Sequence, residues 1–344
     1  MRYMIWNNKG GVGKTFLTYL FASEYAKEHP EKDVVVADVC PQSNLSEMML
    51  GGNGIGEANL ETLWKKDATI ASYIKERYRT SQSTKLGNEA NYFVQVYKYN
   101  KEMPQNLYLL PGDMDLDICS VIINYIGQAP QKNAWKRSRS FLTDLVDSFE
   151  SINKDREKVF FFDCNPSFAN YTEMAVIAAD RIIVPCTADS ASARGVHNLF
   201  RLIYGVELVS KTKTTLPDEG DAFDTFRANV EDGKINLPKV HLFIQNKSRS
   251  LDSSATAAFT AHIKEMEKIV RKAKKLSPNC FTENRRSILN VKDGNTLAAV
   301  ANYSGIPLSK MKHKKYEVYG DLTQVNKSQI DALKEQIQEC VKVL

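Results

Sequence analysis

The sequence predicts an α/β fold, doubly wound around a mostly parallel sheet with helices on both faces. Short β-branched and aromatic runs alternate with stretches of helical periodicity, an order typical of this fold class. Several runs are almost continuously apolar, such as Val34–Ala37 and Val159–Phe162. Parallel strands that are buried on both faces have this composition. The expected strands are Arg2–Asn7, Asp33–Asp38, Leu107–Pro111, Lys158–Asp163, Arg181–Pro185 and Lys239–Gln245.

Apolar spacing predicts three helices in particular. The first lies between the first two strands, ends near His29-Pro30, and carries Leu17, Leu20, Phe21 and Tyr25. The second is an amphipathic stretch over Ser253–Leu276. The last, Ser328–Val343, has one apolar face formed by Ile330, Leu333, Ile337 and Val341. Its acidic residues and sparse basic residues argue against a membrane anchor, so we expect a packing face in the core or in a dimer.

The bulk properties indicate one cytoplasmic domain over residues 1–344. A chain of 344 residues with 43% hydrophobic and 25% charged content is ordinary for a globular α/β protein. No apolar run is long enough for a membrane span or a signal peptide. The six cysteines form no C-x-x-C pair, which suits free thiols in a reduced compartment. Two polar segments, about 67–104 and about 210–233, are expected to be insertions into this domain.

A glycine-rich loop between the first strand and the first helix carries the chemistry. Its glycines allow backbone N–H groups to turn toward phosphate oxygens, and the helix N-terminus adds a positive end. Lys14 adds a full charge, and the Thr15 hydroxyl can bind Mg²⁺. With strand, helix, lysine and threonine in register, a nucleotide site is predicted. The candidate nucleotide-binding residues are Lys9, Gly10, Gly11, Val12, Gly13, Lys14, Thr15 and Phe16.

The loop also contains a second lysine, Lys9, five residues before Lys14. A phosphate cradle within one chain does not require it. In this respect the sequence resembles the ParA/MinD family of deviant-Walker P-loop ATPases, whose loop reads K-G-G-x-G-K-[ST], and is closest to the ParA-type partition ATPases. The resemblance implies a P-loop NTPase fold and an ATP-sandwiched homodimer, in which Lys9 reaches the nucleotide of the partner subunit.

The resemblance continues over most of the chain. Residues 34–45 resemble the family's D-x-D-P-Q-x-N-L segment, residues 106–112 its third strand, and residues 160–167 its Walker B segment, D-x-P-P-S. We therefore expect Asp163 to hold Mg²⁺ through water, together with Thr15 and Asp38. An aspartate at a strand end can alternatively cap the following turn. The residues expected to act in catalysis are Lys9, Lys14, Asp38 and Asp163.

Two positions depart from the family pattern. Cys40 replaces the second aspartate of D-x-D-P-Q, which the family uses to position or activate the attacking water, and Asn165 stands where the family has proline. A thiol does not replace a carboxylate in accepting hydrogen bonds from water unless its pKa is strongly lowered. We therefore expect ATP binding with slow hydrolysis to ADP and phosphate, and Asp38 remains to serve Mg²⁺ or the water.

Two further segments bear on the base. Residues 246–249 resemble the N-K-x-D motif of GTPases, but Arg249 stands at the position where guanine needs an acceptor. Because arginine has only donors, ATP is expected over GTP. Asn246 is a candidate adenine contact, with a turn-forming role as the alternative. Pro307 lies where the family's adenine-side loop is expected, within residues 304–308.

Positive charge gathers in the C-terminal part of the chain. Residues 234–315 contain 13 Lys and 4 Arg against 2 Asp and 3 Glu, so the rest of the chain is net acidic. No base-reading motif accompanies this charge, which predicts phosphate contacts and hence sequence-independent, salt-sensitive DNA binding. Solvated helix faces are the alternative. The clusters are Lys247/Arg249, residues 264–275, Arg285-Arg286 and residues 310–315.

The function expected from this resemblance is that of a ParA-like ATPase that associates with the nucleoid when ATP is bound. Its homodimer would bind DNA non-specifically and position or segregate a plasmid, chromosome or other cargo, while a ParB-like or other adaptor protein stimulates hydrolysis. One alternative is a metabolic P-loop enzyme of kinase, synthetase or reductase type, the last requiring well-placed cysteines such as Cys119 and Cys164. The other is a MinD-like membrane-positioning ATPase, although no stable membrane association is expected.

Overall fold

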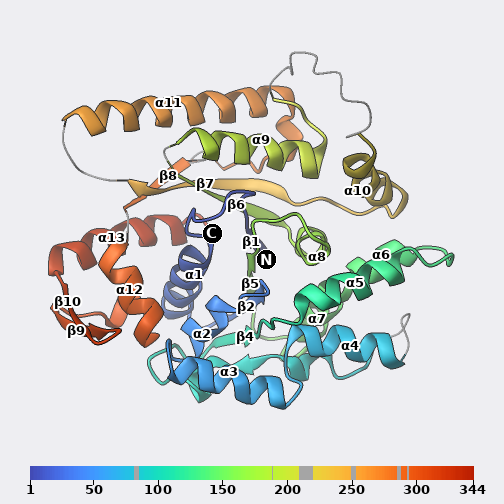
Figure 1. The fold of residues 1–344 in the computed structure, drawn as a ribbon, viewed down its shortest axis with the longest axis horizontal. Helices are drawn as coiled ribbons and strands as arrows, with labels where there is room; N and C mark the ends of the chain where they lie inside the picture. The colour runs from blue at the N-terminus through green and yellow to red at the C-terminus, as the bar shows by residue number, and fades with distance from the viewer. Residues whose placement is uncertain (81–84, 188, 209–219, 249–252, 285–287, 293) are drawn as a thin grey trace.

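The computed structural model describes every residue except 81–84, 188, 209–219, 249–252, 285–287 and 293 (Figure 1). Its centre is an eight-stranded sheet with the strand order β3-β4-β2-β5-β1-β6-β7-β8. Edge strand β3 pairs antiparallel with β4, and the other neighbouring strands of the described sheet are parallel. The predicted fold class, a doubly wound and mostly parallel sheet covered by helices, is confirmed.

The six expected strands are all present, with ends that differ from the prediction by one to three residues. β3, β8 and the hairpin β9–β10 were not predicted, because their short and partly exposed sequences lack a continuous apolar run. The strands are β1 Arg2–Ile5, β2 Asp33–Val39, β3 Val94–Gln95, β4 Leu107–Leu110, β5 Lys158–Cys164, β6 Arg181–Cys186, β7 Lys239–Ser248, β8 Ile288–Lys292, β9 Lys314–Val318 and β10 Asp321–Val325.

The three helices named from the sequence correspond to α1, α11 and α13. The α-helices are α1 Lys14–Glu28, α2 Asn44–Leu50, α3 Ile55–Lys65, α4 Ile70–Thr80, α5 Leu116–Gly127, α6 Ala134–Arg139, α7 Phe141–Ser151, α8 Asn170–Ala178, α9 Ser190–Tyr204, α10 Gly220–Asp232, α11 Ser253–Leu276, α12 Asn295–Ser304 and α13 Lys327–Val341. Short 3₁₀ turns are η1 Glu89–Tyr92, η2 Val96–Lys98, η3 Pro278–Cys280 and η4 Leu308–Lys310.

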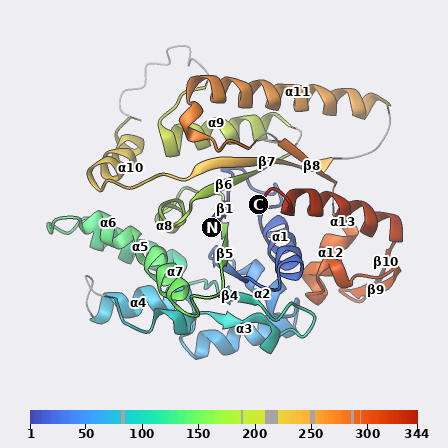
Figure 2. The ribbon, with the colours of Figure 1, turned by 180° about the vertical axis from the view of Figure 1, so that it is seen from behind.

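Two apolar cores cover the two faces of the sheet. Along β1 the side chains alternate, so that Tyr3 and Ile5 face one core and Met4 and Trp6 face the other. The first core is shared with helices α1, α2, α3, α12 and α13, and the second with α4, α5, α7, α8 and α9. Figures 1 and 2 show these two groups of helices on the two sides of the central strands. The near-continuous apolar strands are explained by this burial on both faces.

The last helix, α13, packs its apolar face inside the chain. Its stripe is almost completely buried, and the helix contacts α1 and β8. This agrees with the expectation of a packing face, which here serves the chain's own core. In the part of the chain that the structure describes, no helix is long and apolar enough to cross a membrane.

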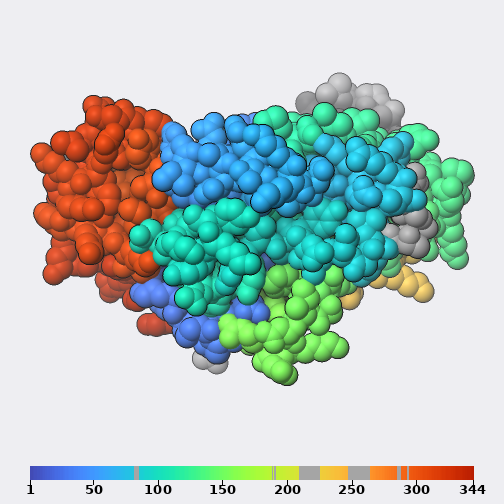
Figure 3. Space-filling model, turned by 90° about the horizontal axis from the view of Figure 1, so that it is seen from below, coloured from blue at the N-terminus to red at the C-terminus, as the bar shows by residue number. Residues whose placement is uncertain are grey.

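The two segments expected to be insertions have different structures. Residues 67–104 contain α4, η1, β3 and η2, so this segment adds an edge strand to the sheet. Together with α3 it forms much of the face seen in Figure 3, beside the C-terminal hairpin. In the second segment, residues 220–232 form α10, while residues 210–219 lie outside the described residues. That the two segments are insertions stays a prediction.

The parallel order brings the ends of four central strands to one edge of the sheet. Ile5 at the end of β1 is in register with Asp163 on β5 and Ile183 on β6, and Asp38 on β2 is in register with Asp163. The loop after β1 and both predicted metal-binding aspartates therefore lie at this edge. In open α/β sheets, ligands bind at this carboxyl edge.

Candidate functional site

The glycine-rich loop leads directly from β1 into the N-terminus of α1. Gly13 is the N-cap residue and has φ 85°, a conformation that favours glycine. A Cβ at Gly13 would lie 2.0 Å from Nδ2 of Asn246, and that amide donates to the Val12 carbonyl at 2.9 Å. The helix has no side-chain cap and no acidic residue in its first turn. Its positive end is therefore presented toward the loop, as an anion site requires.

The two lysines of the loop lie in different surroundings. Lys14 is buried, and its Nζ donates to the carbonyl oxygens of Lys9 at 3.0 Å and Asn7 at 3.4 Å. Burial lowers the pKa of Lys14. The Nζ of Lys9 is directed instead toward the start of α9, where it donates to Thr187 Oγ1 at 2.7 Å and forms an ion pair with Asp189. Lys14 thus belongs to the phosphate loop itself, whereas Lys9 is held outside it.

Asp189 is a site residue that the sequence did not reveal. It is the N-cap of α9 and accepts a hydrogen bond from Ser192 N at 2.8 Å. Partial burial acts to raise its pKa, but hydrogen bonds from Lys9 and Thr187 outweigh this and lower the pKa to about 2. Asp189 is 180 positions from Lys9, so no local motif connects them. Only the pairing of β1 with β6 brings the two residues together.

The two aspartates at the strand ends form the acidic part of the site. Asp38 accepts hydrogen bonds from Ser46 N at 2.9 Å and Ser46 Oγ at 2.8 Å. Asp163 Oδ2 accepts from Thr15 Oγ1 at 2.8 Å, while Asp163 Oδ1 is buried without a hydrogen-bond partner. Buried polar atoms normally have a hydrogen-bond partner, so this oxygen is a candidate ligand for a bound cation. Carboxylate and hydroxyl oxygens are the ligands preferred by Mg²⁺.

Burial governs the protonation of this group. It raises the pKa of Asp38 to about 6, although hydrogen bonds from Ser46 oppose the shift. It also raises the pKa of Asp163 to about 7, with the charge of Asp38 adding to the effect. Burial and then the charge of Asp38 raise the pKa of Cys40 to about 12. Cys40 is therefore a neutral thiol at physiological pH, and cannot take up a proton from water as a carboxylate does.

A cavity of about 540 Å³ lies between the phosphate loop, the segment after β2, the end of β5 and helix α12, while Lys9, Asp38 and Asp163 are not among its lining residues. Two lining residues, Ala298 and Asn302, come from α12, which sequence reasoning did not identify as part of the site. Pro307 is buried just beyond α12, and neither it nor Asn246 lines the cavity. An adenine contact by either residue stays a prediction. The lining comprises Gly10, Gly11, Gly13, Lys14, Thr15, Phe16, Cys40, Gln42, Asn44, Met48, Cys164, Asn165, Pro166, Ala298 and Asn302.

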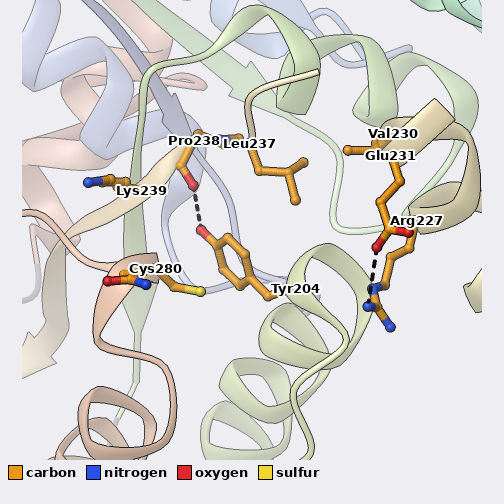
Figure 4. A pocket seen from close by; sticks show the side chains of 9 residues that line it. Tyr204, Arg227, Val230, Glu231, Leu237, Pro238, Lys239 and Cys280 are labelled. Carbon is orange, nitrogen blue, oxygen red and sulfur yellow. Dashed lines mark hydrogen bonds and ion pairs between the residues drawn. The ribbon is translucent and has the colours of Figure 1, made fainter. Parts of the chain in front are cut away.

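A second cavity, of about 300 Å³, lies near the start of β7 (Figure 4). Its wall includes Tyr204, whose hydroxyl donates to the Pro238 carbonyl at 2.7 Å, and Arg227, which pairs with Glu231. It is formed by the ends of α9 and α10 and by the beginning of a strand. It therefore has neither the glycine loop nor the helix N-terminus that a phosphate site requires.

Comparison with known proteins agrees with this arrangement. Residues 3–216 match the family model described as AAA domain. A ParA family protein of Mycoplasma genitalium, MG470, is 23% identical over 295 residues, covering 84% of this chain and 97% of that protein.

Two solved structures are similar over the whole chain. A complex of Cyanothece McdA with ATP has a TM-score of 0.58 at 14% identity and covers 100% of this chain and 96% of its own. A Borrelia burgdorferi protein described as a plasmid partition protein, bound to AMPPNP, has a TM-score of 0.51 at 14% identity, covering 100% and 98%. At these identities the likeness shows the shared fold. The chain therefore belongs to the AAA domain family and is a P-loop ATPase of the ParA/MinD type.

Proposed function

We propose that the protein is a ParA-like positioning ATPase. Two copies close on ATP and Mg²⁺, the closed dimer binds DNA without sequence preference, and hydrolysis stimulated by an adaptor protein releases it. This cycle would position or segregate a plasmid, chromosome or other cargo. The related McdA and Borrelia structures were solved with ATP and AMPPNP, which supports adenine nucleotide as the ligand here.

One observation carries the proposal: the two lysines of a single phosphate loop are separated. Lys14 lies within the cradle formed by the loop backbone, and its charge suffices for a triphosphate bound in the same chain. Lys9 is not among the residues that line the cavity, and its ammonium group is directed to the start of α9. We infer that this cation serves a nucleotide that belongs to a second copy.

The residues present fit Mg²⁺. Thr15, Asp38 and Asp163 would hold the ion, and the unpartnered Oδ1 of Asp163 supplies an oxygen for it. When bound, Mg²⁺ neutralises phosphate charge. The Thr15 hydroxyl would bind the ion through a lone pair on its oxygen while its O–H continues to donate to Asp163. Two hydrogen bonds from Ser46 hold the Asp38 carboxylate in position, so it would orient the ion or its water without moving.

Turnover is proposed to be slow because Cys40 replaces a carboxylate. Its thiol lies at the mouth of the cavity with Asn165, whose Nδ2 is 3.9 Å from Cys40 Sγ. Neither group is ionised at neutral pH, so neither takes a proton from the attacking water. Slow basal hydrolysis leaves the closed dimer to persist until an adaptor acts.

Exposed basic residues on two regions support DNA binding through phosphate contacts. The described part of α11 exposes Lys264, Lys268 and Lys272, and the segment before and within β9 exposes Lys312 and Lys314. Such groups release counterions from DNA without reading its sequence. The side chain of Lys247 and residues Arg249, Arg285 and Arg286 lie outside the described residues.

The structure does not favour the alternative functions. A reductase that shares a metal cluster between subunits needs thiols at the subunit surface, but Cys119 is buried in the core and Cys164, also buried, lines the nucleotide cavity. A MinD-like membrane anchor would need an available apolar face on the last helix, and the stripe on α13 is packed in the core. A kinase or synthetase would be recognised by phosphate transfer to a small acceptor with no effect of DNA.

The test is DNA binding measured by fluorescence anisotropy with a random duplex, in ATP–Mg²⁺, in ADP–Mg²⁺ and without nucleotide. We expect binding only with ATP, and a log–log slope against salt of about −0.9 for each phosphate contacted. Lys9→Ala is the matched control, because it should retain monomer ATP binding but not the DNA complex. Equal affinity with and without nucleotide would contradict the proposal.

A further inference from the structure

Helix α5 exposes a stripe of apolar side chains. Met114, Ile118, Val121 and Tyr125 follow one another at intervals of four, three and four residues and are between 57% and 70% exposed. This spacing puts Ile118, Val121 and Tyr125 on one face of α5, and Met114 lies in the turn just before the helix. The Tyr125 ring contacts that of Tyr78 on α4, at 6.3 Å between centroids. We call Met114 and these three residues of α5 the α5 stripe.

The chain's own core does not need this stripe. The opposite face of α5 is fully buried through Leu116, Cys119, Ile123 and Ile126, where it packs against the rest of the second core. The helix is thus apolar on two faces, of which only one is covered. Isolated exposed apolar residues are ordinary, but a contiguous exposed row marks a surface that binds another molecule.

The stripe adjoins the nucleotide site. Asn170 donates to the Ser120 carbonyl on α5 at 2.9 Å, and α8, which begins with Asn170, follows the cavity-lining residue Pro166 closely. Asn8 of the phosphate loop donates to the Pro166 carbonyl at 3.1 Å and accepts from Asn198 of α9 at 2.8 Å. These contacts join α5, the loop after β5, the phosphate loop and α9 in one continuous rim.

The two ends of this rim carry opposite charges. Asp117 is exposed in the first turn of α5, and Arg194 is exposed in the first two turns of α9, one turn before Asn198. In an isologous dimer each copy presents the same patch to the other. A two-fold axis through the middle of the rim would place α5 of one copy opposite α9 of the other. The α5 stripe of each copy would then be covered, and Asp117 of one copy would lie opposite Arg194 of the other.

We propose that a second copy of this chain covers the α5 stripe when nucleotide closes the dimer, and that the first turns of α9, with Arg194, lie opposite it. This inference rests on the proposed function, because the closure that brings Lys9 to the partner's nucleotide also brings the rims together. A second copy is the proposed partner for two reasons. The stripe continues the rim of the nucleotide site, and Asp117 and Arg194 at the two ends of that rim would pair between two copies.

The experiment measures dimerisation by sedimentation with AMPPNP–Mg²⁺, together with nucleotide affinity by calorimetry. Ile118→Asp and Val121→Asp place a charge within the stripe and should weaken the dimer at least about 30-fold, which is about 2 kcal/mol at 1.4 kcal/mol per tenfold change. Nucleotide affinity of the monomer should not change. Leu322→Asp is the matched control, because Leu322 is 69% exposed on the C-terminal hairpin, away from the rim.

The outcomes separate this inference from the proposed function. If wild-type protein forms no dimer with AMPPNP, the proposed function fails and the inference fails with it. If wild type dimerises and both α5 variants dimerise equally well, only the inference is overturned. If those variants also no longer respond to an adaptor protein, the stripe is a binding surface for that adaptor. Asp117→Lys and Arg194→Glu should each weaken the dimer, and the double variant should recover affinity.

Discussion

The phosphate loop and the ends of strands β2 and β5 meet at one cavity but hold charge in different ways. The cavity is lined by residues 10, 11 and 13–15 of the loop and by Cys40, Gln42, Asn44 and Cys164. The loop works through backbone N–H groups, a helix N-terminus and the buried Lys14, all supplied by one short stretch of chain. The acidic side, at the ends of β2 and β5, depends on the buried carboxylates of Asp38 and Asp163, and its third polar position is the neutral Cys40.

This difference indicates that binding and hydrolysis are separable in this molecule. The loop can receive a triphosphate with the groups it already presents. On the acidic side, one oxygen of Asp163 is buried without a hydrogen-bond partner, and burial raises the pKa of both carboxylates, so a bound cation is proposed to complete this side. Single substitutions on the loop side and on the acidic side should therefore affect different properties.

The largest effect is expected on the loop side. Lys14→Ala should weaken ATP–Mg²⁺ binding at least about 100-fold, or about 3 kcal/mol, because it removes the charge that faces the phosphates. Lys9→Ala should leave the affinity of the monomer within about threefold and should instead prevent dimer formation. Calorimetry and sedimentation measure the two properties. Similar losses of nucleotide affinity in both variants would show that the two lysines do not have separate roles.

On the acidic side, Cys40→Asp should increase ATP turnover at least about tenfold, since a positioned general base contributes roughly 10²–10⁴-fold. The new carboxylate would join Asp38 and Asp163, so the variant should also depend more strongly on Mg²⁺. Cys40→Ser is the matched control, because it is polar and of similar size but gains no charge. Steady-state phosphate release measures the rates. An unchanged or lower rate in Cys40→Asp would place residue 40 away from the attacking water.

The raised pKa values predict a pH dependence for the metal-free protein. Because burial raises the pKa of Asp163 to about 7 in the folded chain, the protonated acid is favoured there relative to the unfolded chain. The stability due to this group is present below about pH 4, the unfolded value, and is lost as the pH rises through 7. In EDTA the melting temperature should therefore be lower at pH 8 than at pH 5.

Mg²⁺ with ATP should remove most of this loss, because the cation favours the ionised carboxylates. Asp163→Asn is the control, and in EDTA its melting temperature should fall less between the same two pH values. The Asp38 carboxyl, with a pKa of about 6, adds a shift of the same sign at lower pH. A wild-type melting temperature that rises from pH 5 to pH 8 in EDTA would contradict this account.

The central strands and the phosphate loop could be read from the sequence because their signals are local. β2 and β5 are continuous apolar runs, and Gly13, Lys14 and Thr15 stand together at the start of a helix. β8 and the hairpin β9–β10 were not predicted because many of their side chains are exposed and none of these strands has a continuous apolar run.

Contacts between side chains from different secondary-structure elements could not be predicted. Asp189 meets Lys9 only because β6 lies beside β1, and Ser46 meets Asp38 only because α2 folds back on the end of β2. The wall supplied by Asn302 depends on the position of α12, far along the chain. The helix itself could have been expected from its apolar spacing and from Gly305 at its end, but its place beside the nucleotide cavity could not.

The smallest effect is expected at the ion pair between Lys9 of the phosphate loop and Asp189 at the start of α9. If this pair holds Lys9 back in the monomer, Asp189→Asn should tighten the nucleotide-dependent dimer by about 1.5- to 5-fold, because partly exposed ion pairs are worth about 0.2–1 kcal/mol. Asparagine keeps the N-cap of α9, whereas the control Asp189→Ala would lose it at about 0.5–2 kcal/mol. Sedimentation with AMPPNP measures the change. A weaker dimer in Asp189→Asn would contradict this account. It would mean that the Asp189 carboxylate stabilises the closed dimer instead of holding Lys9 back in the monomer.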